Sequence, residues 1–305
     1  MADRKQRTFK PRINPLESMT AAELQHRFRF DQEGIEFITY LIQNDIMPLT
    51  NRNHSVPAIV QVMVALRYYA TGKMQLCSGD NFGLHQSTVS RIIQRVTTAL
   101  VQPIIVKRFV SFPMDPGTIR KHQVDFFAIA GFPGVVGAID GTHVRIIAPS
   151  EHEVEYVNRK NFHSINVQIV CDTCYKILDI VASWPGATHD ARILRESGLF
   201  QHFQRRLLPV KCHLLGDSGY PGKDWLLTPF LNPQAGPQSR YNSNVIIACG
   251  VLHNIAKMFN LPLPDDDDNA DAYNDNGNAN DHIVADIQGT DGRAYRNHIV
   301  SAHFM

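Results

Sequence analysis

Two short apolar segments of this chain each end in an aspartate, and a glycine follows within two residues. The first segment covers 135–139 and ends at Asp140, and the second covers 213–216 and ends at Asp217. Short apolar runs bounded by glycine are typical of buried strands. The pattern predicts two strands of one sheet, each ending in an acid and a glycine turn, with the two carboxylates side by side.

Two carboxylates that converge at strand ends suit Mg²⁺ or Mn²⁺, because these ions prefer hard oxygen ligands. Hydrolases that cleave phosphodiesters use such ions on the attacking and leaving oxygens. For either aspartate alone, capping of the turn after a strand is the more common role. The pair in matching contexts favours metal binding, so Asp140 and Asp217 are the candidate catalytic and metal-binding residues.

The stretch from 111 to 260 has the pattern of an α/β domain, with 111–132 interpreted as a connection to the part before it. Its strand and helix signals alternate, which predicts a mixed sheet with flanking helices. The expected strands are 135–147, 166–171, 177–183 and 213–215, and the expected helices are 191–205 and 243–259.

The stretch from 19 to 110 lacks strand patterning and is predicted to be all α-helical, after a flexible basic arm at 1–18. Residues 78–96 resemble a helix-turn-helix, with a first helix ending at Gly83 and a second capped by Ser87. Such a second helix can lie in the major groove of DNA, and its candidate contacts are Arg91, Gln94 and Arg95. The alternative is an amphipathic helix pair that only packs.

Composition narrows the class of protein. With 44% hydrophobic and 19% charged residues, the chain has the usual composition of a soluble globular protein. No apolar run approaches the length of a membrane span, and the first residues lack the apolar core of a secretory signal. Five cysteines in 305 residues do not indicate a disulfide framework, which favours a reducing compartment, cytosol or nucleus.

The net charge of +1 hides an asymmetry. Nine aspartates and two arginines lie after residue 264, so the remainder of the chain is basic. A basic body with an acidic tail fits a polyanionic partner, but charge alone favours the simpler alternative, a soluble domain with a solvated tail. The segment 261–305 is predicted to be largely disordered.

Six motifs occur in one order over about 55–260. They are Ala138–Val144, Tyr156–Lys160, His163–Asn166, Trp184–Asp190, Leu215–Tyr220 and Ala248–Ile255. In this ordered set the chain resembles the DDE-type transposases of the PIF/Harbinger superfamily and the nucleases derived from them. The resemblance implies an RNase H-like core, an Asp-Asp-Glu set in which Asp140 and Asp217 are the first two acids, and a divalent metal. It also implies a DNA substrate, a Myb-like DNA-binding partner protein, and a location in nucleus and cytoplasm.

The third acid of that set has no counterpart here. In the family, a glutamate-bearing helix follows the segment that begins near Arg240, but here Asn242 runs directly into Ser243 and no glutamate occurs after Glu196. The domain is therefore interpreted as internally truncated near 242–243. We expect little or no cleavage by this chain, or, as the alternative, a catalytically inactive DNA-binding or scaffold protein.

A further segment, 184–194, begins a helix directly after a strand. Asp190 is a candidate cap of that helix, and His189 or Asp190 could instead support the metal ligands from outside, as could His143. Either Asp190 or Glu196 could replace the missing acid, although their spacing does not argue for it. Arg159 and Lys160 are candidate phosphate contacts, with a solvated surface as the alternative. A metal-dependent phosphatase is a more remote alternative.

Overall fold

The computed structural model describes residues 14–48, 54–230 and 297–300. The chain divides into two compact units, one up to Phe109 and one from Val110 onward. The basic arm, the predicted helix at 243–259 and the acidic tail lie largely outside the described residues.

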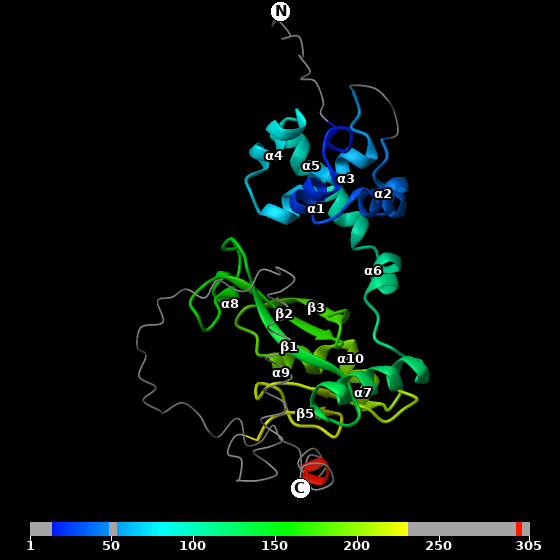
Figure 1. The fold of residues 1–305 in the computed structure, drawn as a ribbon. Coiled ribbons are helices and arrows are strands. Elements are labelled where there is room, and N and C mark those ends of the chain that lie inside the picture. The colour runs from blue at the N-terminus through cyan, green and yellow to red at the C-terminus, as the bar shows by residue number, and fades with distance from the viewer. Residues whose placement is uncertain (1–13, 49–53, 231–296, 301–305) are drawn as a thin grey trace, which may run out of the picture. The chain divides into compact units, whose positions relative to one another are not determined.

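The N-terminal unit is helical in its described part (Figure 1). Its elements are η1 (Pro15–Glu17), α1 (Ala21–Phe28), α2 (Gln32–Ile46), α3 (Ala58–Thr71), α4 (Gln75–Phe82), α5 (Gln86–Leu100) and α6 (Pro103–Phe109). The central helix is α3, whose residues Val62 to Ala65 are completely buried. A helix that is apolar on every side belongs in the middle of a core, and α1, α2, α4 and α5 all contact α3.

Helices α4 and α5 flank the turn that the sequence indicated. Gly83 ends α4 in the left-handed conformation, with φ of 65°. The cap of α5 is His85, whose Nδ1 accepts the backbone N–H of Ser87 at 3.3 Å, so Ser87 is not the cap. The helix pair is present, and its role as a DNA-binding helix-turn-helix stays a prediction.

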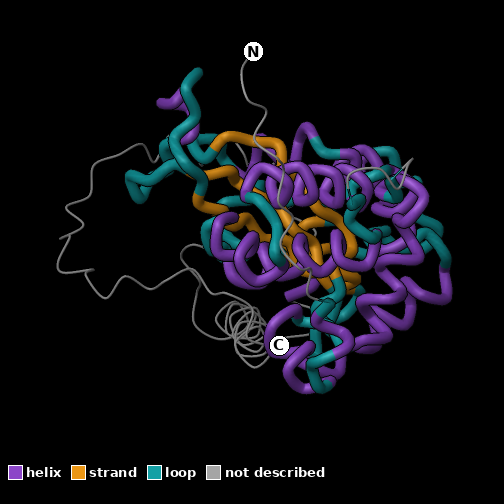
Figure 2. Tube along the Cα trace, turned by 90° about the horizontal axis from the view of Figure 1, so that it is seen from above, coloured by secondary structure: helices purple, strands orange, loops and turns teal. Residues whose placement is uncertain are grey.

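The second unit has a mixed five-stranded sheet with helices packed on it (Figures 1 and 2). The strands are β1 (Val135–Arg145), β2 (Ser164–Cys171), β3 (Ile177–Pro185), β4 (His213–Leu215) and β5 (Leu226–Leu227), in the order β3-β2-β1-β4-β5. The β1–β2 and β2–β3 pairs are antiparallel, and the β1–β4 and β4–β5 pairs are parallel. The helices are α7 (Pro116–Ala130), α8 (Glu153–Tyr156), α9 (Asp190–Glu196) and α10 (Gly198–Gln204). The α/β class with a mixed sheet is confirmed, and RNase H-like topology stays an expectation from the family.

The segment 111–132 is not merely a connection. It contains α7, which Asp115 caps by accepting the N–H of Thr118 at 2.8 Å. Ile119 and Phe126 of this helix are buried in the cores of the second unit. The sequence did not predict this helix, because charged residues interrupt its apolar pattern.

The single helix expected at 191–205 is two helices. Ser197 separates α9 from α10, donating its hydroxyl to Leu194 O at 2.7 Å and accepting the N–H of Phe200 at 3.1 Å. One serine thus ends the first helix and caps the second.

The described residues near the C-terminus are not a solvated tail. Ile299 and Val300 are buried and pack with Phe126, Phe132 and Leu215. The rest of the segment 261–305 lies outside the described residues, and its predicted disorder stays a prediction. None of the described helices has the length and apolar character needed to span a membrane.

Candidate active site

Two parallel strands align the two aspartates that the sequence singled out. Ala138 of β1 pairs with Leu215 of β4, and Asp140 and Asp217 each lie two residues further along. Because the strands run in the same direction, equal offsets bring both residues to the same level of the sheet. β1 continues past Asp140 to Arg145, in agreement with the expected strand 135–147, so Asp140 is not at the end of its strand.

A third carboxylate, that of Asp190, reaches the same place from the start of α9. A Cβ atom added to Gly141 would overlap Asp190 Oδ1 and stand 2.8 Å from its Cγ. A Cβ atom added to Gly219 would stand 3.1 Å from Asp217 Oδ1 and 3.5 Å from Asp190 Oδ2. The Asp190 carboxylate therefore lies between the residue after Asp140 and the turn after Asp217.

Neighbouring acids of this cluster raise the pKa values of Asp140 and Asp217. Partial burial and the charges of Asp217 and Asp190 raise the pKa of Asp140 to about 6, against the N–H of Gly141, which Asp140 Oδ1 accepts at 2.8 Å. Burial and the charge of Asp190 raise the pKa of Asp217, while the N–H of Gly219 and the charge of Arg159 lower it. Both residues are nevertheless exposed, so water screens part of these effects.

The loop before β2 holds two cations near the acids. Asn158 is buried; its Oδ1 accepts the backbone N–H of Lys160 at 2.9 Å and of Phe162 at 3.3 Å, and its Nδ2 donates to Ser164 Oγ at 3.0 Å. Arg159 in this loop lowers the pKa of Asp217. The predicted phosphate contacts therefore belong to a loop that a buried amide fixes.

The two histidines named from the sequence have different surroundings. His143 Nδ1 lies 3.1 Å from Ser164 Oγ; burial lowers its pKa, and the nearby charge of Asp190 opposes this. His189 is the exposed N-cap residue of α9, and its side chain makes no capping hydrogen bond. The structure brings Asp190 and His143 toward the acids by these interactions, and it shows none for His189.

Two buried residues near the acids had no role in the sequence interpretation, although both lie in the quoted motifs. Tyr220 follows Asp217 by three residues, is 3% exposed, and has a hydroxyl without a hydrogen-bond partner in the described part of the chain. Burial and the charges of the three aspartates raise its pKa, so it stays a neutral phenol. Asn166 of β2 is 3% exposed and donates to Asp190. In a sequence, a tyrosine in such a position usually indicates packing, and an asparagine usually indicates a turn. The sequence interpretation therefore gave neither residue a role in the site.

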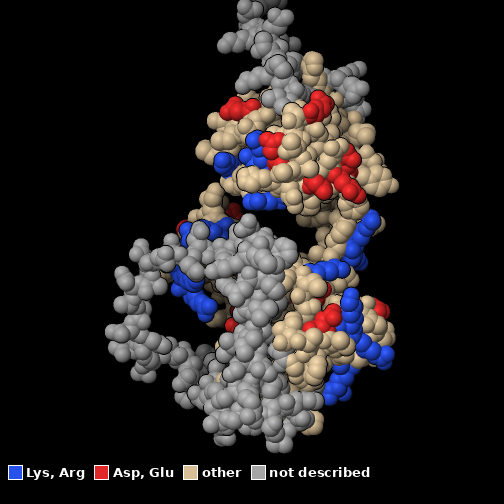
Figure 3. Space-filling view, in the orientation of Figure 1, with Lys and Arg blue, Asp and Glu red and all other residues tan. Residues whose placement is uncertain are grey.

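The predicted nucleic-acid contacts on α5 are not equivalent. Arg91, Gln94 and Arg95 are all exposed, and Arg95 also donates from Nη1 to the Oε1 atom of buried Gln61 at 2.8 Å. Figure 3 shows a few basic side chains on the visible face of this unit, with acidic side chains beside and around them. Arg95 therefore has a structural partner inside its own unit.

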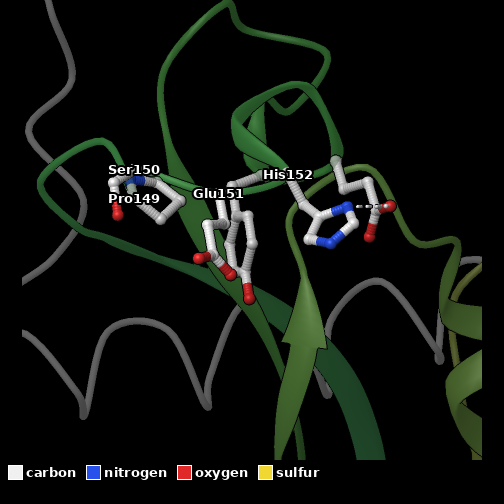
Figure 4. Close-up of a pocket in the computed structure, with 6 residues that line it drawn as sticks. Pro149, Ser150, Glu151 and His152 are labelled. Carbon is white, nitrogen blue, oxygen red and sulfur yellow. Dashed lines mark ion pairs between the residues drawn. The ribbon is translucent and has the colours of Figure 1, made fainter.

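A pocket of about 370 Å³ lies on the β1–β2 connection (Figure 4). Its lining includes Glu151, Glu155 and His152, with His152 Nδ1 3.5 Å from Glu155 Oε1. Its lining includes none of Asp140, Asp190 and Asp217, so this pocket is not the candidate active site.

Comparison with known proteins places the acids in a family context. A family model described as DDE superfamily endonuclease matches residues 139–254, which include all three aspartates. "Putative nuclease HARBI1" of Mus musculus is 30% identical over 292 residues, covering 82% of this chain and 83% of that protein. Its counterpart of the same name in Rattus norvegicus is 32% identical over 279 residues, 79% of each chain.

The chain belongs to the Harbinger transposase-derived DDE family. "Protein ALP1-like" of Arabidopsis thaliana is 34% identical over 198 residues, which cover 60% of this chain and 47% of that protein. No solved structure matches.

DDE superfamily endonucleases generally use divalent metal ions, and the donor types here fit such an ion. Asp140, Asp190 and Asp217 offer carboxylate oxygens, the ligands that Mg²⁺ and Mn²⁺ prefer. Within the described ranges, no three His, Cys, Asp or Glu side chains form a complete metal-binding group as they stand.

Proposed function

We propose that this DDE family chain cleaves phosphodiester bonds of DNA in a reaction that depends on Mg²⁺ or Mn²⁺. The observation that supports this most is the parallel pairing of Ala138 with Leu215, which sets Asp140 and Asp217 at one level of the sheet. Asp190 supplies a third acid at the same place. Three carboxylates in one cluster are costly without a cation and useful with one.

Each side chain of the cluster has a proposed part in this reaction. Asp140, Asp190 and Asp217 would hold the ion, which when bound supplies Lewis-acid activation of the phosphodiester and of the attacking water. Arg159 and Lys160 bind the negatively charged DNA backbone beside the acids. Tyr220 packs against the glycine that precedes Asp217, because its Cδ2 would stand 3.2 Å from a Cβ atom added to Gly216. Its neutral ring forms the buried side of the proposed site.

We propose that the absence of the family's glutamate lowers the rate without abolishing cleavage. No glutamate follows Glu196 in the sequence, and we propose that an aspartate completes the set. The position of Asp190 makes it the replacement that the geometry favours over Glu196, whose carboxylate instead accepts the Nε–H of Arg195 at 3.3 Å. This revises the expectation that the chain has two acids only.

A plasmid-nicking assay with the full chain tests this proposal. We expect slow conversion of supercoiled DNA to the open form with Mn²⁺ or Mg²⁺, and none with EDTA. Asp140→Asn and Asp217→Asn should lower the rate at least about 100-fold, whereas Asp45→Asn, an exposed aspartate of α2, should not. A folded wild-type chain that leaves the plasmid intact with both ions would overturn the proposal.

The second candidate function is a DNA-binding or scaffold protein without catalysis, and the missing glutamate favours it. DNA binding without nicking in the same preparation would select it. A Myb-like partner protein and residence in nucleus and cytoplasm are proposed from the family alone. Co-precipitation from cells and imaging of the tagged chain test them.

A further inference from the structure

Strand β2 carries an unusual row of buried polar residues. Ser164, Asn166 and Gln168 are 0%, 3% and 0% exposed. Their spacing of two residues places all three on one face of the sheet. A buried amide that lacks partners costs about 1–3 kcal/mol, and Gln168 has both side-chain polar atoms unpaired within the described residues. At Ser164 and Asn166, hydrogen bonds to other parts of the unit offset part of this cost.

The middle residue of the row, Asn166, holds the third acid. Its Nδ2 donates to Asp190 Oδ1 at 2.8 Å and to the backbone carbonyl of Thr188 at 2.9 Å. Both partners can only accept a hydrogen bond, so they fix which way the amide faces. The two bonds tie the start of α9 to the centre of the sheet.

These bonds determine which carboxylate oxygen of Asp190 remains available. The terminal torsion of an aspartate is soft, so its carboxylate turns unless a neighbour fixes it. Asn166 engages Oδ1, while Oδ2 is the oxygen that lies toward Gly219 and Asp217. The absence of a side chain at Gly141 leaves the room that this arrangement requires.

We infer that Asn166 is a positioning residue of the active site, which turns the Asp190 carboxylate so that Oδ2 lies toward Asp217 and would be available to hold a divalent cation. This inference rests on the proposed function for the cation. The alternative is that Asn166 only anchors α9, and in that case the cation affinity would not depend on it through Asp190.

Mn²⁺ binding to the full chain, measured by isothermal titration and by the Mn²⁺ EPR signal, tests the inference. Removing an outer group that orients a ligand costs about 10- to 100-fold in metal affinity, so we expect at least about tenfold weaker binding in Asn166→Ala. Asn166→Leu preserves the shape without the donor and should show the same loss, which guards against a folding defect in the alanine variant.

The double variant separates positioning from anchoring. If Asn166 acts through Asp190, Asn166→Ala adds no further loss to Asp190→Asn. Gln168→Leu is the matched control, because it removes an equally buried amide two residues away and should bind Mn²⁺ like the wild type. Losses that multiply in the double variant, or an Asn166→Leu chain that binds Mn²⁺ normally, would overturn the inference.

The two proposals fail in different ways. If the wild type binds Mn²⁺ and Asn166→Ala weakens it but no DNA is nicked, the inference stands and the nuclease proposal falls. If the wild type binds Mn²⁺ and nicks DNA with Asn166 unimportant, only the inference falls. A wild type that binds no Mn²⁺ overturns both.

Discussion

Gly141 and Asp190 lie so close together that a Cβ atom at position 141 would overlap the Asp190 carboxylate. The sequence suggested that this glycine forms a turn after the first acid. It instead lies inside β1, and its φ is not among the positive values of the described glycines. Its part is to leave space for the third acid.

Gly141→Ala should therefore disturb the site. We expect a loss of about 1–3 kcal/mol in the free energy of unfolding, because a methyl group must displace the short Asp190 side chain. Mn²⁺ affinity should fall as well. Gly198→Ala is the matched control: nothing lies within 4 Å of its added Cβ, and helix α10 should gain up to about 1 kcal/mol. Urea unfolding of both variants measures the difference, and equal stabilities would contradict the expectation.

The acid cluster should make stability depend on pH in a defined direction. The raised pKa of Asp140, about 6 against an ordinary 3.8, means that its proton is bound more tightly in the folded chain. The carboxylate therefore destabilises the metal-free fold above about pH 6, and the effect vanishes below about pH 4, where both states are protonated. Allowing for solvent screening, Asp140→Asn should stabilise by about 1 kcal/mol near pH 7.5 and by less near pH 4.5. Denaturant melts in EDTA at both pH values measure this, and a gain that grows toward low pH would contradict it.

Tyr220→Phe should not destabilise the metal-free chain. The hydroxyl is buried without a partner in the part of the chain that the structure describes, and such a group costs about 1–3 kcal/mol. Phenylalanine keeps the ring against the strands and removes that cost. Tyr40→Phe, at an exposed position of α2, provides the baseline. A clear drop in melting temperature for Tyr220→Phe alone would show that the hydroxyl has a stabilising partner.

Alanine substitutions at two arginines of α5 should distinguish a residue that contacts DNA from one that stabilises the unit. Arg91→Ala should weaken DNA binding, reduce its salt slope by about one and leave stability unchanged. Arg95→Ala should lower stability by about 1–3 kcal/mol, because it leaves Oε1 of buried Gln61 unpaired. Fluorescence anisotropy against salt and thermal melts measure the two effects. Unchanged DNA affinity in Arg91→Ala would remove α5 from the DNA interface.

Short apolar runs bounded by turn residues were sufficient to predict β1 to β4 and the approach of Asp140 to Asp217, but not the two-residue strand β5. Strand signals are local, and parallel neighbours align their ends without further information. Helix α7 escaped prediction because only two of its apolar residues face the cores, although Asp115 and Pro116 form a normal helix start.

Sequence reasoning named Asp190 as one possible replacement for the missing acid but gave no reason to prefer it. An aspartate that begins a helix normally serves the helix, and nothing in the sequence near Asp190 shows that Asn166, in another strand, holds its carboxylate. The partners of a buried amide in a strand cannot be predicted from the neighbouring sequence either, because they come from tertiary contacts.

Anomalous diffraction from crystals of the full chain soaked with Mn²⁺ tests the central claim most directly. The account predicts a Mn²⁺ peak in contact with oxygens of Asp140, Asp190 and Asp217, at about 2.2 Å from each. A peak bound only by other residues, or three carboxylates that stay apart with no ion between them at saturating Mn²⁺, would contradict it.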